Sequence, residues 1–357
     1  MKQFIPETAI KKIWGTERQA VDCRACGVTH LLPLGDDLSR CPACLSKSLK
    51  PHTNDLQPEP PQKLIPFAAK LSSGRLAGIL SDWLKGIRLR PADLCVERLL
   101  ARRRQVYWPM WMVEGTVVGT WQAQMGFEYQ VESSKERFRD EQGWSTQRLT
   151  ETKVRWEPRA GRITRTYRDL ALPALETREQ AQLDAYLGGY DVSRVVAFTP
   201  DATAKSAVRV PSLTTQEALP LAETALYRMA TADCQRAAGA QHHKAFTLEA
   251  DYRALKWTQL LLPFYVTYYE DDNGQPIPVW VNGQSGHVDG VKCASLRRGW
   301  RITRNAGIMA TLIFLTGALL MLLGVTDAGS VVMTLGFFAV IIAALPVLWV
   351  WQFNQRH

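Results

Sequence analysis

Two long uncharged stretches toward the C-terminal end constrain this chain more than any other feature. Residues 306–326 contain no charged residue, and 308–325 are almost continuously apolar. After the break at 326–330, a second uncharged apolar run covers 331–353. Each run is long enough to cross a hydrocarbon core about 30 Å thick, and neither has the polar face of a soluble core helix. The sequence therefore predicts a transmembrane hairpin with helices at 306–326 and 331–353.

The charges that flank these two runs predict their orientation. The loop between them contains only Asp327, whereas the outer flanks carry only basic residues: Arg297, Arg298, Arg301 and Arg304 before the first run, and Arg356 after the second. Basic residues favour the cytoplasmic side of a membrane. We therefore expect a two-span protein of the inner (cytoplasmic) membrane with both termini in the cytoplasm.

Four cysteines near the other end form the most specific chemical motif. Two C-x-x-C pairs, separated by fourteen residues, consist of Cys23, Cys26, Cys41 and Cys44. This spacing is typical of a four-thiolate zinc ribbon, in which two tight turns aim four sulfurs at one ion. Gly27 suits the positive φ that such a turn needs. Disulfides are the competing interpretation. Four thiolates leave no open coordination position, so we expect structural rather than catalytic Zn²⁺.

The other three cysteines, Cys95, Cys234 and Cys293, have no framework spacing. That pattern fits a reducing compartment, in which zinc thiolates persist. The first residues of the chain lack an apolar signal-peptide core, so we expect no cleaved signal peptide.

The length of 357 residues suggests several units. We expect an N-terminal segment, 1–50, with the zinc ribbon at about 20–50. A proline-rich linker, 51–63, follows. Residues 64–300 then form a cytoplasmic α+β domain with an antiparallel sheet, which makes the chain an α+β multidomain membrane protein.

Within 64–300, apolar periodicity predicts the elements. Residues 71–103 are mostly helical, with Gly86 as a C-cap and Pro91 near the start of a second helix. A further helix is clearest at 215–238. Aromatic and β-branched residues predict strands at 106–121, 127–131, 152–156, 163–167, 244–252, 260–269, 276–281 and 287–291.

The net charge of +9 is concentrated in two stretches. Residues 85–104 contain seven basic and two acidic residues, and residues 292–304 contain five basic residues and no acidic one. The second stretch adjoins the predicted membrane spans. The first could be a solvated helix face, a lipid contact or a nucleic-acid contact. Residues around the ribbon are nearly balanced in charge, which disfavours DNA binding there.

Several motifs resemble one family. In order along the chain they are the ribbon, 64–67 (LIPF), 83–86 (WLKG), 90–94 (RPADL), 107–111 (YWPMW), 190–200, 262–265 (LPFY) and 281–290 (VNGQSGHVDG). In this order they resemble the bacterial zinc-ribbon membrane proteins often labelled primosomal-protein-N′-like or replication-factor-Y-like helicases. A helicase needs a phosphate-binding loop, and the sequence contains no G-x-x-x-x-G-K-[ST] motif. From its own residues, Asn282–Gly286 is interpreted as a tight turn rather than a binding loop.

The resemblance implies a non-enzymatic protein, whose relatives tend to be encoded near phage-shock-protein-A-like or stomatin/flotillin-like membrane factors. It thus suggests a role in envelope maintenance or in assembly on the membrane, with the ribbon presented to a partner.

Three hypotheses follow. The leading one is a non-enzymatic, membrane-anchored adaptor or scaffold whose ribbon and α+β domain dock a membrane-associated protein. The alternative is a membrane-tethered nucleic-acid-binding protein that uses the ribbon and the basic stretch 85–104. An enzyme with an unrecognised pocket is the third, although no catalytic motif occurs in the sequence.

Overall fold

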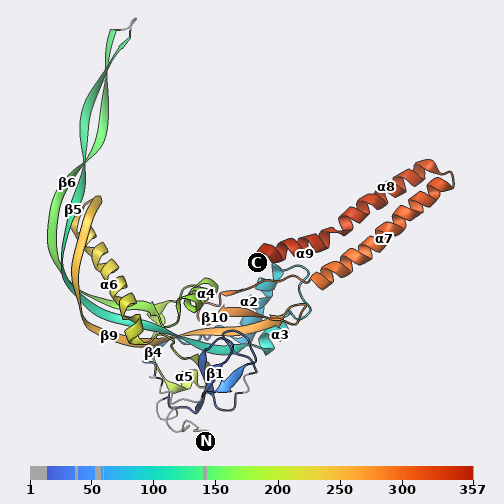
Figure 1. The fold of residues 1–357 in the computed structure, drawn as a ribbon, viewed down its shortest axis with the longest axis horizontal. Helices are drawn as coiled ribbons and strands as arrows, with labels where there is room; N and C mark the ends of the chain where they lie inside the picture. Colours follow the sequence, from blue (N-terminus) through green and yellow to red (C-terminus); the bar gives the residue numbers. More distant parts are fainter. Residues whose placement is uncertain (1–13, 37–38, 53–57, 59, 140–142, 357) are drawn as a thin grey trace. The chain divides into compact units, whose positions relative to one another are not determined.

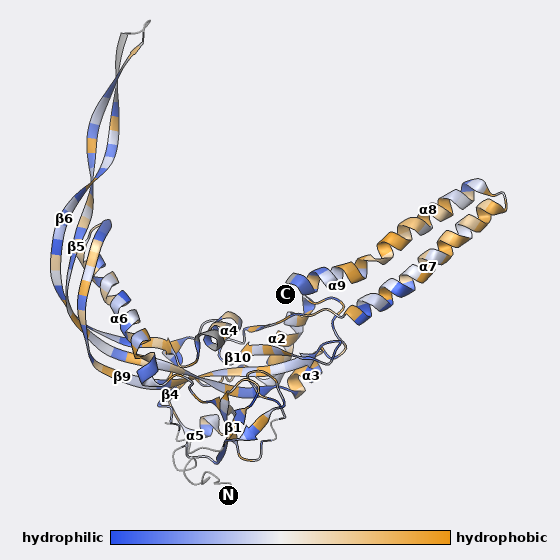
Figure 2. Cartoon of the chain, in the orientation of Figure 1, coloured by the Kyte–Doolittle hydropathy of each residue, from blue (hydrophilic) through white to orange (hydrophobic). Residues whose placement is uncertain are grey.

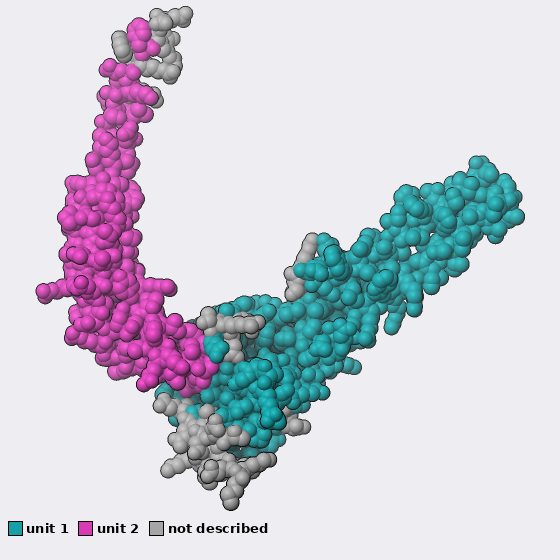
Figure 3. All heavy atoms as spheres, viewed as in Figure 1, with its two compact units in different colours: residues 1–109, 176–210, 260–357 teal, residues 110–175, 211–259 magenta. Residues whose placement is uncertain are grey.

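The computed structural model describes residues 14–36, 39–52, 58, 60–139 and 143–356 (Figure 1). Contacts divide the chain into two compact units (Figure 3). Unit 1 comprises Met1–Pro109, Glu176–Val210 and Leu260–His357, and unit 2 comprises Met110–Leu175 and Pro211–Gln259. Residues 64–300 contribute to both units.

Unit 1 is built on one sheet. From one edge to the other, its strands are ordered β11-β10-β9-β5-β8-β2-β1-β3, and β4 pairs with both β7 and β9. In chain order the strands are β1 (Arg18–Cys23), β2 (Thr29–Pro33), β3 (Leu49–Pro51), β4 (Lys63–Leu64), β5 (Arg104–Arg139), β7 (Val196–Ala197), β8 (Ala207–Arg209), β9 (His242–Glu270), β10 (Pro276–Asn282) and β11 (Val288–Gly290). By residue number, β5 and β9 continue into unit 2.

The expectation of a purely antiparallel sheet is wrong at two places. Most ladders are antiparallel, but β5 runs parallel to β8, with Val106 opposite Ala207. The second exception is β4, which runs parallel to β9, with Lys63 opposite Leu260. The sheet is therefore mixed, since these partners come from distant segments rather than from hairpins.

The cysteine-rich segment is part of this sheet. Its strand β2 pairs with β8, where His30 lies opposite Arg209 and Leu31 opposite Val208. Leu31 and Val208 are fully buried in a cluster that also contains Trp14, Tyr107 and Leu261. The strands β1 and β2, which flank the first cysteine turn, are thus in the same sheet as the strands of the α+β region. In the expected linker, residues 53–57 and 59 lie outside the described residues.

Two helices cover part of the unit 1 sheet. The amphipathic helix α2 (Ser73–Lys85) begins at its N-cap Ser72 and ends at Gly86, the expected C-cap. It buries Leu76, Leu80 and Trp83 against residues of β9 and β10, including Tyr269 and Val281. The second helix, α3 (Val96–Ala101), begins five residues later than Pro91 suggested. The segment 91–94 is a turn instead, in which Asp93 accepts hydrogen bonds from Arg98 of α3 and from the amide of Glu270 on β9.

The Asn282–Gly286 segment lies in a turn between β10 and β11, as expected. It also fixes the segment that contains α4 (Thr177–Leu187), η1 (Val192–Arg194) and α5 (Pro200–Thr203). The buried Asn282 amide donates to the Leu187 carbonyl over 2.9 Å. Gln284 exchanges two hydrogen bonds with the backbone of Asp191, at 2.7 and 2.9 Å.

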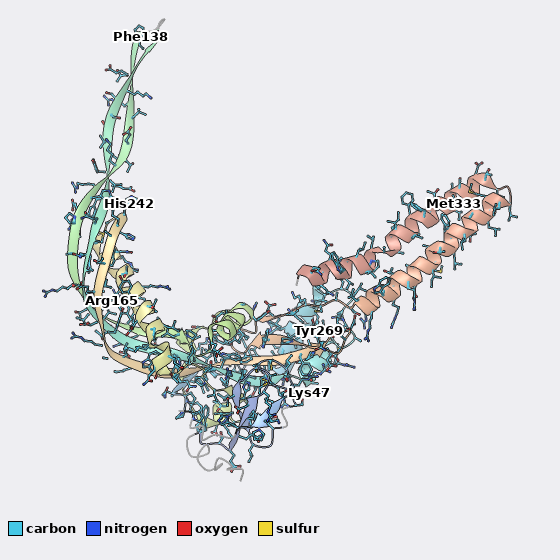
Figure 4. The ribbon with its side chains drawn as sticks, viewed as in Figure 1. Lys47, Phe138, Arg165, His242, Tyr269 and Met333 are labelled. Carbon is cyan, nitrogen blue, oxygen red and sulfur yellow. The ribbon has the colours of Figure 1, made fainter. Side chains whose placement is uncertain are left out.

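An apolar helix pair completes unit 1 (Figure 2). It consists of α7 (Leu296–Leu322) packed against α8 (Thr326–Ala343), which continues after a break at Ala344 into α9 (Leu345–Arg356). Glycines allow close packing: a Cβ on Gly317 would lie 2.3 Å from the backbone nitrogen of Met333, which is labelled on α8 in Figure 4. The second helix begins at Thr326, five residues before the predicted start. Both helices are long and apolar enough to cross a membrane.

Unit 2 consists of β6 (Gly143–Pro173), parts of β5 and β9, and α6 (Thr215–Ala238). The bounds of α6 match the prediction; a capping box at Thr214 and Glu217 starts it, and Gly239 at φ 66° ends it. Its buried stripe packs on Val113, Val117 and Tyr167. The short strands predicted between 106 and 269 are instead three long ones, β5, β6 and β9. Of these, β5 and β6 pair from Met110–Pro173 to Arg139–Gly143.

Candidate metal centre

The four predicted cysteine ligands come together at one place in unit 1. Their sulfur atoms all lie within 4.8 Å of one another. The Sγ atoms of Cys23 and Cys44 are 3.5 Å apart, and those of Cys26 and Cys41 are 3.8 Å apart. The first cysteine of each pair is buried, and the second is exposed.

The two C-x-x-C turns have the same backbone hydrogen bonds. In the first turn, the amide of Cys23 donates to the carbonyl of Val28 (2.9 Å), and the amide of Gly27 donates to the carbonyl of Cys23 (2.8 Å). In the second turn, the amide of Cys41 donates to Ser46 (2.8 Å), and the amide of Leu45 donates to Cys41 (2.8 Å). The chain thus makes the same turn twice, and each turn places two sulfurs on one side.

These distances fit a tetrahedral metal ion. Zinc–thiolate bonds of about 2.3 Å in a tetrahedron place the sulfurs roughly 3.8 Å apart. The measured sulfur–sulfur distances of 3.5 and 3.8 Å are close to this value. A disulfide requires a sulfur–sulfur bond of about 2.05 Å, so the arrangement is that of four separate thiols or thiolates. The four cysteines could therefore hold one metal ion.

A cation bound here would have to offset the burial of Cys41. Burial raises the pKa of Cys41 well above its ordinary value, although the amide N–H groups of Cys44 and Ala43 lower it. A bound cation supplies the positive charge that keeps such a sulfur ionised.

A histidine supports the second turn. His30 is fully buried on β2, with Nε2 3.7 Å from the Cys41 sulfur. Burial, together with the positive charge of Arg209, lowers its pKa to about 3. A neutral imidazole with its proton on Nε2 would donate a weak hydrogen bond to a Cys41 thiolate. From the sequence, His30 lies between the two pairs and is not needed as a ligand in a site that already has four sulfurs.

Beside the second turn lies a groove of about 220 Å³, lined by residues of that turn, by α3 and β5, and by β9. Arg40 connects its two sides. This arginine donates to the Leu45 carbonyl (3.1 Å), pairs with Glu270 (3.1 Å) and lies over the ring of Tyr268 at 5.0 Å. Arg102 lies over the same ring at 4.7 Å. The second cysteine turn is therefore linked directly to the central strand β9. No sequence pattern had pointed to Arg40 or Tyr268.

Most cations of the basic stretch 85–104 have partners within unit 1. Asp93 binds both Arg98 and Arg102, and hydrogen bonds join two other arginines to Asp36 and Ser73. Lys85 pairs with Asp82 on α2 at 2.7 Å. These contacts engage positive charges that a continuous basic surface would need in order to bind nucleic acid.

Comparison with family models, with curated proteins and with solved structures gives no match for this chain. The family resemblance stated from the motifs therefore stays a prediction.

Proposed function

We propose that this chain is a non-enzymatic, membrane-anchored scaffold whose zinc-stabilised segment and central sheet dock a protein partner at the cytoplasmic face of the inner membrane. One observation carries the proposal. The four-cysteine cluster belongs to the same compact unit as the foot of the apolar helix pair, where α7 begins and α9 ends.

Zinc is the metal that we propose. A tetrahedral set of four sulfurs suits Zn²⁺ or an iron–sulfur cluster, and sulfurs about 3.8 Å apart match a single zinc ion. Four thiolates leave no position for water or substrate, so the ion stabilises the two turns rather than catalysing a reaction.

For the membrane, the exposed side chains of the helix pair support the proposal. Apolar residues such as Leu312, Phe337 and Ile342 are more than half exposed along α7 and α8. Hydrocarbon, rather than water, is the solvent that suits such surfaces. The arginines at the start of α7 favour a cytoplasmic foot, and hence cytoplasmic termini.

The docking surface that we propose is the groove beside the second turn. It offers guanidinium groups and a tyrosine ring, groups that are enriched at protein interfaces. Because Arg40 contacts both Leu45 and β9, loss of the metal would change the shape of the groove. Partners of phage-shock-protein-A-like or stomatin/flotillin-like type remain the class that we expect, from the family resemblance.

The test uses a photoreactive amino acid in place of Ser39, which is exposed in the groove. Lys205, exposed on the same unit, is the control position. After irradiation of intact cells, we expect crosslinks to one membrane-associated protein from position 39 and not from position 205. Cys41→Ser/Cys44→Ser should abolish them, whereas Cys95→Ser/Cys293→Ser should not. Identical crosslinks in all variants would contradict docking at this groove.

A further inference from the structure

Several arginines of unit 1, including a group of six, form no ion pair with any residue that the structure describes. All six are exposed, and they lie in two short segments: Arg88 and Arg90 after α2, and Arg297, Arg298, Arg301 and Arg304 within the first nine residues of α7. The first pair belongs to the basic stretch 85–104, whose other cations are engaged as described above. The distribution of partners thus divides that stretch into a structural part and an unpaired part.

The two arginine segments are adjacent in space. The amide of Ser295, the N-cap of α7, donates to the carbonyl of Leu89 over 2.7 Å. Arg88 and Arg90 therefore flank the backbone position at which α7 begins. In addition, Arg90 and Arg298 line the same cavity of about 280 Å³, in which Glu97 is the single carboxylate among the lining residues.

The foot of the helix pair is fixed to the sheet. The side chain of Asn354 on α9 exchanges two hydrogen bonds with the backbone of Ala294, at 2.8 and 3.0 Å. Asp272 accepts hydrogen bonds from Ser295 Oγ (2.8 Å) and from the amide of Arg297 (2.9 Å). Phe353 packs against the core that contains α2. The unpaired arginines are consequently held at one level along the helix pair rather than on a mobile tail.

That level corresponds to the membrane surface. The uncharged part of α7 starts directly after Arg304, and Trp300 is 61% exposed one turn before it. On the returning helix, Trp351 is 60% exposed. Tryptophan favours the headgroup region of a bilayer, where phosphates lie. Guanidinium groups bind phosphate oxygens through paired, charge-assisted hydrogen bonds.

We propose that Arg88, Arg90 and Arg298 form a binding site for the phosphate of an anionic phospholipid at the foot of α7, with the other arginines of α7 as its rim. This inference rests on the proposed membrane anchoring. A bilayer lipid is favoured over nucleic acid because the site adjoins the apolar helices. The other cations of the basic stretch 85–104 already have protein partners.

The experiment is native mass spectrometry of the full chain in non-ionic detergent, titrated with phosphatidylglycerol or with phosphatidylcholine. Arg88→Gln/Arg90→Gln and Arg298→Gln remove charges from the site. Arg148→Gln/Lys153→Gln removes two exposed charges from β6 of unit 2 as a matched control. Arg88→Lys/Arg90→Lys keeps the charge but removes the guanidinium geometry. Resistance of each variant to alkaline extraction from membranes tests the anchoring separately.

We expect phosphatidylglycerol affinity to fall about tenfold or more in Arg88→Gln/Arg90→Gln, since each basic residue near an anionic surface contributes about 1 kcal/mol. Arg298→Gln and the lysine variant should fall less, and the β6 control should equal the wild type. Phosphatidylcholine binding should not change in any variant.

Three results would overturn the lipid site. The first is unchanged phosphatidylglycerol binding in Arg88→Gln/Arg90→Gln when that variant still resists alkaline extraction. The second is full displacement of the lipid by millimolar inorganic phosphate, which would indicate a site for free phosphate. In the third, Arg88→Gln/Arg90→Gln loses affinity for a short DNA duplex and keeps its affinity for phosphatidylglycerol. Extraction of the wild-type chain by alkali would instead refute the membrane anchoring.

Discussion

Gly27 and Leu45 occupy equivalent positions in the two cysteine turns, and both have a left-handed backbone, with φ of 71° and 59°. Each directly follows the second cysteine of its pair, and each amide donates to the carbonyl of the first. Glycine adopts this conformation freely, whereas leucine is strained in it. The second turn tolerates the strain because the Leu45 side chain is buried, at 3% exposure. The two turns therefore solve one geometric problem with different residues.

This equivalence predicts that glycine destabilises the protein less than alanine does when it replaces Leu45. Leu45→Ala loses burial and keeps the strain, whereas Leu45→Gly loses slightly more burial and relieves the strain. We expect Leu45→Gly to be more stable than Leu45→Ala by about 1 kcal/mol, the cost of a left-handed non-glycine residue. Gly27→Ala should lose a similar amount of stability. Its Cβ would meet nothing within 4 Å, so the left-handed backbone is the only cost. Urea unfolding of the full chain in detergent measures all three. If alanine is the better residue at position 45, the turns are not equivalent.

A pH-dependent stability is predicted for Asp93. Burial opposes its ionisation, but hydrogen bonds from Arg102, the amide of Glu270 and Arg98 outweigh burial and lower its pKa to about 2. A lowered pKa contributes stability above the ordinary value near 3.8, and this contribution is lost as the pH falls toward 2. We expect Asp93→Asn to cost about 2 kcal/mol at pH 7 and much less near pH 2. Asp82→Asn, at an exposed pair, is the control and should leave the unfolding midpoint unchanged. A pH-independent cost of Asp93→Asn would contradict the account.

The Asn282 turn should be sensitive to a single substitution. Asn282 is fully buried, donates to Leu187, and accepts from the amides of Gln284 (2.8 Å) and Ser285 (3.0 Å). Asn282→Ala removes these three bonds and a longer one to the Gly189 carbonyl (3.5 Å), and it leaves buried groups unpaired, so we expect a loss of about 2–4 kcal/mol. Asn273→Ala, at the exposed tip of the β9–β10 turn, should cost less than about 0.5 kcal/mol. Equal effects would mean that the turn does not fix the α4 segment.

Close packing of the helix pair gives a matched comparison within α7. A side chain on Gly317 would collide with the backbone of α8, whereas a Cβ on Gly307 would meet nothing within 4 Å. Gly317→Leu should therefore lower the thermal unfolding midpoint in detergent, by an overpacking cost of about 1–3 kcal/mol. Gly307→Leu should leave it unchanged or raise it slightly, since leucine is the better helix former. A similar response of both variants would indicate that α7 and α8 do not pack at Gly317.

Local patterns predicted the elements that local forces determine. The bounds of α6 follow from its capping box and from Gly239, and the pair of apolar helices follows from composition alone. The cysteine cluster follows from the repeated C-x-x-C spacing, because each turn is built from its own hydrogen bonds. These features depend on residues only a few positions apart.

Long-range pairing could not be predicted in this way. The pairing of His30 with Arg209 joins β2 to β8 across half of the chain, and neither segment indicates its partner. The sequence also predicted two short strands, 152–156 and 163–167, where the structure has the single strand β6, with Pro158 between them. This proline lies within β6, opposite Gln124 of β5. Among the described strands, β6 pairs only with β5, and an edge strand can lose one amide donor.

The most direct test of the account is the zinc content of the full chain, purified from membranes that have been washed with alkaline carbonate. We predict one zinc ion per chain in the wild type and in Cys95→Ser/Cys293→Ser, and little or none in Cys41→Ser/Cys44→Ser. Elemental analysis of the same samples for iron separates zinc from an iron–sulfur cluster. Wild-type protein that resists extraction but contains far less than one zinc per chain, or contains iron instead, would contradict a zinc-stabilised membrane scaffold.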